Sequence, residues 1–161
     1  LRLPNITSFK DVSKILYTTR ADVTHLASGT HAGSLKSALE YAQEREQFGR
    51  SITKFQLIQE KLARMEANTI TGLGLSHRLA ILQDQGKFAE VPASIAKMQN
   101  ARLLRETAAL GREIVGGNGI TAEHKVARFF GDAEAIYSYE GTHEVNSLII
   151  GRFLTGKGAF V

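Results

Sequence analysis

The chain has 161 residues, of which 43% are hydrophobic and 22% are charged. These values are typical of one folded domain with a substantial core, and they argue against a disordered chain or a fibrous repeat. Twenty basic and sixteen acidic residues give a net charge of +4, without a block of five or more like charges, so nucleic acid is not expected as a partner. The lack of cysteine excludes disulfides and thiolate metal sites.

Two features concern the membrane and the extent of the chain. No apolar run approaches the roughly 20 residues that cross a bilayer, and residues 1–4 do not have the layout of a signal peptide. We therefore expect no membrane insertion. Because the sequence begins without Met, we expect a processed chain or a piece of a longer one.

The first half of the chain predicts two long amphipathic helices. One begins at a capping-box pattern, Ser8 with Asp11, and runs to a turn at Phe48–Gly49. The other follows a similar cap pattern at Thr53 and Gln56 and is weakened locally by glycines. The core-facing residues are expected to be Val12, Ile15, Leu16, Val23, Leu26, Ala27, Leu35, Ala38, Leu39 and Ala42, then Ile58, Leu62, Met65, Ile70, Leu73, Ala80 and Ile81.

The second half predicts three further helices. Pro92 suits the first position of a third helix, which ends at Gly116–Gly117, where a left-handed backbone costs glycine little. Thr121 is expected to cap a fourth helix, and the segment after Gly141 forms a fifth. No strand of convincing alternation is found. The predicted fold class is all-α, an up-and-down bundle of about five helices. The stripe of the third helix includes Ile95, Ala101, Leu104, Ala108 and Val115.

The densest polar cluster is Tyr139-Glu140-Gly141-Thr142-His143-Glu144, where a loop meets the start of the predicted fifth helix. Partial desolvation by the apolar and aromatic neighbours would make a carboxylate there a better general base, whereas the helix dipole acts in the opposite direction. Helix capping or a surface role explains the same residues, because acidic residues commonly precede helices. The residues by themselves leave both interpretations open.

A metal site is an alternative for the same cluster. Glu140 with His143, and Asp22 with His25, have the carboxylate-x-x-His spacing of di-metal sites in four-helix bundles. Such a site needs further inward-facing carboxylates, and Gly141 with Thr142 indicates the start of a helix and not its interior. We therefore predict no metal.

Two further segments carry weak phosphate-binding signals. Gly116-Gly117-Asn118-Gly119 is rich in glycine but follows a predicted helix, whereas the dinucleotide fingerprint follows a strand. Arg45-Glu46-Gln47-Phe48-Gly49 places an arginine and an aromatic ring together, which suits a phosphate beside a planar ring. Each segment taken alone is equally a helix end.

Four motifs, taken together and in order, resemble the C-terminal domain of flavin-dependent acyl-CoA dehydrogenases over nearly the whole chain. The resemblance implies that residues 1–161 are a C-terminal helical bundle that normally follows an N-terminal helical domain and a middle β-domain. The ending from residue 139 to 160 looks most similar to that of glutaryl-CoA dehydrogenase and of short-chain acyl-CoA oxidases. The motifs are Arg45-Glu46-Gln47-Phe48-Gly49, Phe55-Gln56-Leu57-Ile58, Gly116-Gly117-Asn118-Gly119-Ile120 and Tyr139-Glu140-Gly141-Thr142.

The resemblance also implies roles for individual residues. Glu140 matches the base that removes the α-proton of an acyl-CoA thioester while the β-hydrogen leaves as hydride to the flavin. Gly141 matches a residue that contacts substrate through its backbone, and Arg20 matches an arginine near the CoA portion. Arg45, Gln56 and the 113–117 backbone are implied to contact the FAD of a neighbouring subunit. The full set of implied FAD contacts is Arg45, Phe48, Gln56, Glu113, Ile114, Val115, Gly116, Gly117, Thr142 and Phe160.

Partners and location follow from the resemblance alone. It implies an acyl-CoA substrate, a homotetramer that assembles through an apolar face of this domain, and an electron-transferring flavoprotein as electron acceptor. The isolated domain is expected to be inactive. The implied location is the cytoplasm in a bacterium or the mitochondrial matrix in a eukaryote.

Two other functions stay open. A short-chain acyl-CoA oxidase would pass its electrons to oxygen. A non-catalytic helical assembly module would use the same residues for structure only and would bind no flavin.

Overall fold

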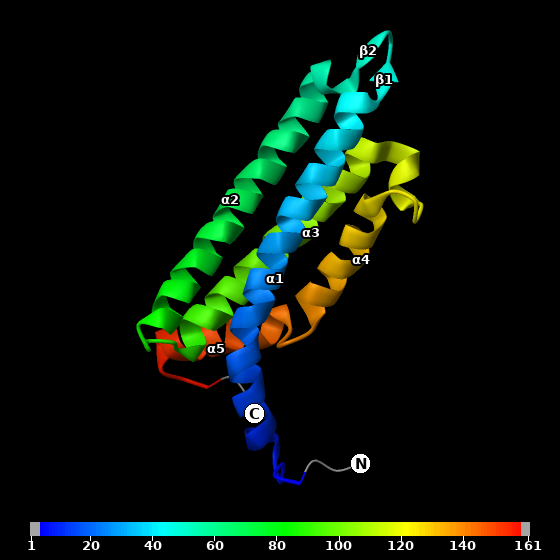
Figure 1. The fold of residues 1–161 in the computed structure, drawn as a ribbon. Coiled ribbons are helices and arrows are strands. Elements are labelled where there is room, and N and C mark those ends of the chain that lie inside the picture. Colours follow the sequence, from blue (N-terminus) through cyan, green and yellow to red (C-terminus); the bar gives the residue numbers. More distant parts are fainter. Residues whose placement is uncertain (1–3, 159–161) are drawn as a thin grey trace.

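The computed structural model describes residues 4–158, and within that range it confirms an all-α fold with five α-helices. The four longer ones run up and down beside one another, and α5 crosses one end of the bundle (Figure 1). The central helix, α3, packs against each of the other four. The helices are α1 (Phe9–Glu44), α2 (Gln56–Asp84), α3 (Glu90–Val115), α4 (Lys125–Ser138) and α5 (His143–Thr155).

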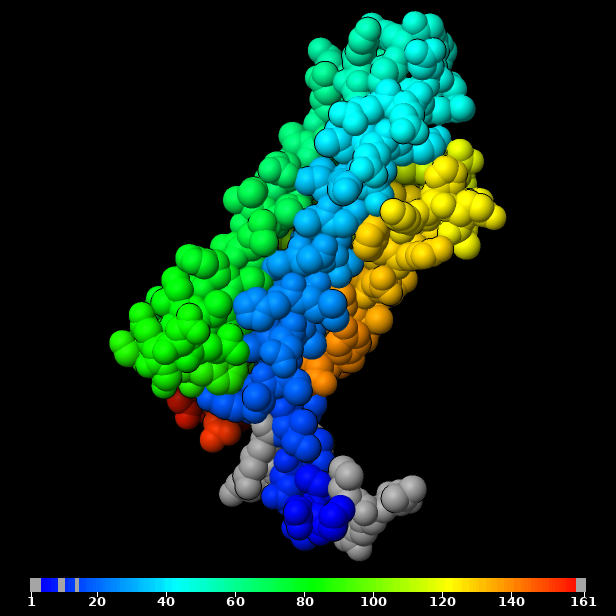
Figure 2. Space-filling model, viewed as in Figure 1, coloured from blue at the N-terminus to red at the C-terminus, as the bar shows by residue number. Residues whose placement is uncertain are grey.

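The helix α1 forms a ridge along the molecule, with α2 on one side and α4 on the other (Figure 2). Its first turns extend beyond the ends of the neighbouring helices (Figure 1). The predicted start of this helix is confirmed, since the Asp11 carboxylate accepts a hydrogen bond from the Ser8 N–H at 3.1 Å. No described helix has a stretch long and apolar enough to cross a membrane.

The connection between α1 and α2 differs from the prediction. The helix α1 ends at Glu44, and two short antiparallel strands follow, β1 (Glu46–Gln47) and β2 (Arg50–Ser51), joined by the tight turn at Phe48–Gly49. Strands of two residues are too short to give a readable alternation of side chains. Thr53 does not cap α2: it lies in a short 3-10 turn, η1 (Ile52–Lys54).

Two starting positions in the second half are also corrected. Pro92 is the third residue of α3 and not the first, which costs no hydrogen bond because the first turn of a helix leaves its N–H groups unpaired. Thr121 does not cap α4, because its hydroxyl donates to the Asn118 carbonyl at 3.1 Å within the region after α3. The end of α3 falls at Gly116, in a left-handed conformation as predicted, and the 3-10 turn η2 (Gly116–Ile120) follows.

A seam of small and polar side chains joins α1, α2 and α3. Asn100 of α3 donates hydrogen bonds to the Thr24 carbonyl and the Ser28 hydroxyl, both at 2.9 Å. A Cβ on Gly72 of α2 would lie 2.3 Å from the Asn100 side-chain oxygen, so only glycine lets the helices approach here. A glycine that weakens α2 as an isolated helix is therefore required by its packing.

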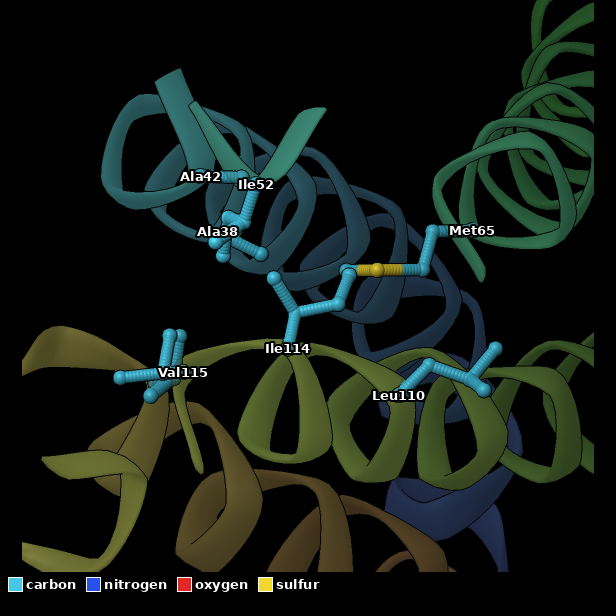
Figure 3. Packing of buried hydrophobic residues seen from close by; sticks show 8 residues of the cluster. Ala38, Ala42, Ile52, Met65, Leu110, Ile114 and Val115 are labelled. Atoms are coloured by element: carbon cyan, nitrogen blue, oxygen red, sulfur yellow. The ribbon is translucent and has the colours of Figure 1, made fainter. Parts of the chain in front are cut away.

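An apolar cluster fills the end of the bundle near the hairpin. Met65 of α2 extends toward Ile114 of α3, between Ala38 on α1 and Leu110 on α3 (Figure 3). Each of these side chains is buried. Since Ile114 also lies close to the end of α3, this cluster fixes the end of α3 relative to the hairpin.

Part of the predicted core is instead on the surface. Small buried side chains let α1, α2 and α3 pack closely, and a second apolar stripe on these helices then faces outward. The apolar residues that recur at helical spacing therefore do not all belong to the core of the chain. The exposed residues of this kind are Ile15, Leu26, Leu39, Ile70, Leu73 and Ile95.

Candidate functional site

The acidic turn, residues 139–142, joins α4 to α5 at one end of the bundle (Figure 1). Glu140 has a φ of 55° and Gly141 a φ of 89°, so both residues are in the left-handed region. A non-glycine residue rarely adopts this conformation, and it persists where the surrounding structure holds it. The acidic turn is therefore held by tertiary contacts.

The carboxylate of Glu140 lies against α1. Its Oε2 accepts a hydrogen bond from the Thr19 hydroxyl at 2.5 Å. Its backbone carbonyl accepts one from Arg20 Nε at 3.5 Å, and the Arg20 side chain is anchored to Ser94 at 3.2 Å and to Glu90 at 3.4 Å. A half-buried carboxylate held by one hydroxyl is oriented without being enclosed, which suits a general base.

Two buried side chains hold the acidic turn from α3 and α5. Lys97 Nζ donates to the carbonyl oxygens of Tyr137, at 3.0 Å, and Gly141, at 2.7 Å. Asn146 Nδ2 donates to the carbonyl oxygens of Gly141, at 2.8 Å, and Thr142, at 3.0 Å. Lys97 is 1% exposed and Asn146 is fully buried. The two side chains together bond three carbonyl groups of this segment, and the Gly141 carbonyl accepts from both of them.

Burial shifts the titration of groups around the acidic turn. Burial, followed by the charge of Arg20, lowers the pKa of Lys97 to about 8, although Glu140 and Glu144 act to raise it. Burial also raises the pKa of the Tyr139 phenol, and two nearby carboxylates add to that shift.

A cavity of about 600 Å³ opens beside the acidic turn. Arg20 and Gly141, the two residues implied to contact substrate, line it, whereas Glu140 does not. The remaining wall comes mainly from apolar side chains of α1 and α5, so the cavity suits a ligand that is largely apolar with a few polar groups. These apolar residues are Leu16, Val145, Ile149 and Phe153.

Thr142 and His143, the two residues that follow Glu140 and Gly141, have structural partners. The Thr142 hydroxyl caps α5 by accepting a hydrogen bond from the Val145 N–H at 3.3 Å. The His143 ring stacks on Tyr137, with the ring centroids 5.3 Å apart. Across residues 4–158, no three histidine or acidic side chains gather in a way that could hold a metal ion. The geometry gives the di-metal alternative no support.

The second group of predicted residues gathers at the opposite end of the bundle. A cavity of about 420 Å³ lies between the β1–β2 hairpin, the start of α2 and the end of α3, and we call it the hairpin pocket. Six of the residues implied to contact FAD line it, from segments far apart in the sequence. They are Arg45, Phe48, Ile114, Val115, Gly116 and Gly117.

The hairpin pocket combines a cation, an exposed ring and accessible backbone. The Phe48 side chain is 91% exposed and makes an edge-to-face contact with Phe55, with the ring centroids 6.1 Å apart. A Cβ on Gly116 or Gly117 would meet no atom of the chain within 4 Å, so this backbone is open to approach from outside. With Arg45 on the same wall, the pocket can accept a molecule that carries both phosphate and a planar ring.

Two predicted residues lie apart from these two places, and a third is not among the described residues. Gln56 is exposed at the start of α2, in a neighbouring hollow that shares Phe55 with the hairpin pocket. Glu113 turns toward α2 and forms an ion pair with Lys61 at 2.6 Å, which lowers the pKa of its carboxyl group. Phe160 lies outside the described residues.

Several contacts of the site were not found by sequence reasoning. Thr19, Lys97 and Asn146 all contact the acidic turn from other helices. Lys97 carries a readable signal, since it lies four residues after Ala93 and four before Ala101 on the buried stripe of α3. A lysine on such a stripe needs a partner for its charge. Thr19 and Asn146 carry no comparable signal.

Known proteins resemble the chain in sequence and in fold. Residues 9–155 match the family model of the acyl-CoA dehydrogenase C-terminal domain. A caffeyl-CoA reductase–Etf complex subunit, CarC, from Acetobacterium woodii is 34% identical over 149 residues, which are 92% of this chain and 39% of that protein.

Solved structures also resemble the chain. A glutaryl-CoA dehydrogenase from Mycobacterium smegmatis superposes with a TM-score of 0.91 at 40% identity, covering 99% of this chain and 41% of that one. A glutaryl-CoA dehydrogenase from the same organism in complex with FADH2 gives 0.87 at 35% identity, with 91% and 38% covered. The chain therefore spans about two fifths of the length of these proteins.

Proposed function

The chain belongs to the acyl-CoA dehydrogenase family, and on this premise we propose that residues 1–161 are the C-terminal domain of an FAD-dependent enzyme that oxidises an acyl-CoA thioester to the enoyl-CoA. One observation carries the proposal. Most of the residues predicted from the sequence lie at two places at opposite ends of the bundle, the acidic turn with its cavity and the hairpin pocket (Figure 1).

In this proposal Glu140 accepts the α-proton of the substrate. Its carboxylate is oriented by the Thr19 hydroxyl, and that hydrogen bond weakens when the carboxylate takes up a proton. Gly141 and Arg20 bring the thioester beside it, since both line the adjoining cavity. The apolar walls of that cavity exclude water, which strengthens a weak base acting on a carbon acid.

The hairpin pocket fits part of a flavin dinucleotide. The Arg45 guanidinium can bind phosphate, the exposed Phe48 ring can pack on a planar group, and the Gly116–Gly117 backbone can approach closely. When bound, the flavin supplies the chemistry of hydride acceptance. The acidic turn lies at the opposite end of the bundle from the hairpin pocket. The hairpin pocket and the adjacent Gln56 therefore serve the FAD of a neighbouring subunit.

The finer parts of the proposal concern substrate, assembly and location. Glutaryl-CoA is the proposed substrate, supported by the 40% identity to a glutaryl-CoA dehydrogenase. A homotetramer would cover outward-facing residues such as Ile70 and Leu73 of α2. An electron-transferring flavoprotein is the proposed acceptor, supported by the relative named as part of an Etf complex. The proposed location is the cytoplasm in a bacterium or the mitochondrial matrix in a eukaryote.

The test is anaerobic reduction of bound flavin in the full-length gene product. Glutaryl-CoA and butyryl-CoA are each added to wild type, Glu140→Gln and Glu144→Gln, at equal FAD content. Glu144 is a suitable control because it is an exposed carboxylate four residues away, on α5. We expect wild type and Glu144→Gln to bleach, and Glu140→Gln to lose at least about 1,000-fold in rate, because it lacks the base.

The outcomes separate the parts of the proposal. Bleaching of Glu140→Gln at the wild-type rate would remove Glu140 as the base. Bleaching by butyryl-CoA but not by glutaryl-CoA would keep the dehydrogenase and reject the glutaryl assignment. Rapid reoxidation of the reduced flavin by oxygen, with release of hydrogen peroxide, would favour the oxidase.

A further inference from the structure

A buried lysine connects the two sides of the acidic turn. Lys97 Nζ reaches the carbonyl of Tyr137, three residues before Glu140, and that of Gly141, the residue after it. One ammonium group thus joins the last turn of α4 to the acidic turn. Asn146, the other buried donor, contacts only carbonyls that follow Glu140.

This position has two physical consequences. The last carbonyls of a helix lack partners within the helix, and a cation beside them is favourable, so Lys97 stabilises the point where α4 ends. The Gly141 carbonyl accepts from both Lys97 and Asn146, which fixes the peptide plane between Gly141 and Thr142. Because the Tyr137 carbonyl is held on the other side of the acidic turn, the backbone between these two points, which includes Glu140, has little freedom to leave its conformation.

We infer that Lys97 is a positioning residue for Glu140: it holds the acidic turn in the left-handed conformation that presents the carboxylate. The inference rests on the proposed function, because it assigns Lys97 a role in the proton transfer by Glu140.

The charges that act on Lys97 come from each element around it. Arg20 on α1 is a second buried cation, and Glu140 in the acidic turn and Glu144 on α5 are the nearby anions; α4 contributes the Tyr137 carbonyl. Burial and the charge of Arg20 make the ammonium easier to neutralise than an exposed lysine. Replacing Lys97 by an uncharged residue removes one of two cations beside the carboxylate.

The test uses Lys97→Met and Lys97→Gln in the full-length gene product. Methionine removes the donors and the charge, whereas glutamine keeps an amide donor without the charge. Thr107→Val is the matched control, since Thr107 is a buried polar residue on the same helix, bonded to His31 at 3.0 Å and away from the acidic turn. The readouts are FAD content, the dissociation constant of the acyl-CoA, and the limiting rate of flavin reduction.

We expect Lys97→Met to lower the limiting rate about 10- to 100-fold with FAD content and acyl-CoA affinity preserved, because a small displacement of the base costs this much. Lys97→Gln should show a smaller loss of rate, because it keeps an amide donor at this position. Thr107→Val should show no such loss.

Several results would overturn the inference. One is a wild-type limiting rate in both Lys97 variants, and another is an equal loss of rate in Thr107→Val, which would mark a general effect of destabilisation. If Lys97→Met does not fold, Lys97→Gln decides by its limiting rate at preserved FAD content and acyl-CoA affinity. The proposed function has a separate test. It fails if Glu140→Gln reduces flavin at the wild-type rate, regardless of the result for the Lys97 variants.

Discussion

Two turns of the described chain place a non-glycine residue in the left-handed region directly before a left-handed glycine. One is Phe48–Gly49 in the hairpin, and the other is Glu140–Gly141 in the acidic turn. Each belongs to one of the two candidate sites, and their surroundings differ. Phe48 is 91% exposed and meets one aromatic edge, whereas the acidic turn is bonded to buried Lys97 and Asn146.

The difference shows how each site is completed. Hydrogen bonds from three other helices of the same chain hold the acidic turn in shape without any partner. The hairpin turn is held by its two short strands and leaves its ring in solvent. A large exposed ring on a strained turn is costly unless another molecule covers it, which agrees with the proposal that a neighbouring subunit brings FAD to this end.

The largest effect is expected from Gly141→Ala. At a φ of 89° alanine is strained, and its Cβ would lie 3.2 Å from Asn146 Nδ2, which cannot move without losing its bonds to the acidic turn. We expect a loss of about 2 kcal/mol in the free energy of unfolding, measured by chemical denaturation.

Gly49→Ala is the matched control. Gly49 has a φ of 75°, and a Cβ there would meet nothing within 4 Å, so the hairpin can adjust. We expect a loss of about 1 kcal/mol. Equal losses at the two glycines would contradict the view that buried contacts hold one turn and not the other.

A pH effect should follow from the buried lysine. The pKa of Lys97 is lowered from 10.5 to about 8 in the folded state, so between pH 8 and 10.5 the unfolded chain binds more protons than the folded one. Stability contributed by this group therefore rises with pH across that window, by about 1 kcal/mol from pH 8 to pH 9. Chemical denaturation of wild type and Lys97→Met at several pH values measures this contribution as the difference between their free energies of unfolding. A difference that does not change with pH would contradict the lowered pKa of Lys97.

The smallest effect on stability is expected from Phe48→Asn. Asparagine tolerates the left-handed region, and the Phe48 ring is almost fully exposed, so the free energy of unfolding should change by less than about 0.5 kcal/mol. The FAD content of the full-length gene product should nevertheless fall, because the ring lines the hairpin pocket. A large loss in the free energy of unfolding together with unchanged FAD content would contradict both expectations for Phe48.

The sequence determined the helices and the members of both sites to different extents. The 3.6-residue periodicity and the glycines at 116 and 141 placed five helices and their turns, because these signals are local. The periodicity could not tell which of two apolar stripes on α1 and α2 faces the core. Leu26 and Ile70 belong to such stripes and are exposed. That choice depends on how closely the neighbouring helices approach.

The resemblance carried by the four motifs implied roles for Glu140, Gly141 and Arg20 toward the substrate, and for Arg45, Phe48 and residues 114–117 toward FAD. Only the tertiary structure decided that these are two separate sites at opposite ends of the bundle. It alone brought Thr19, Lys97 and Asn146 to the acidic turn, because hydrogen bonds between helices distant in sequence leave no local pattern. Local backbone preference names the turn residues, and long-range packing decides what holds them.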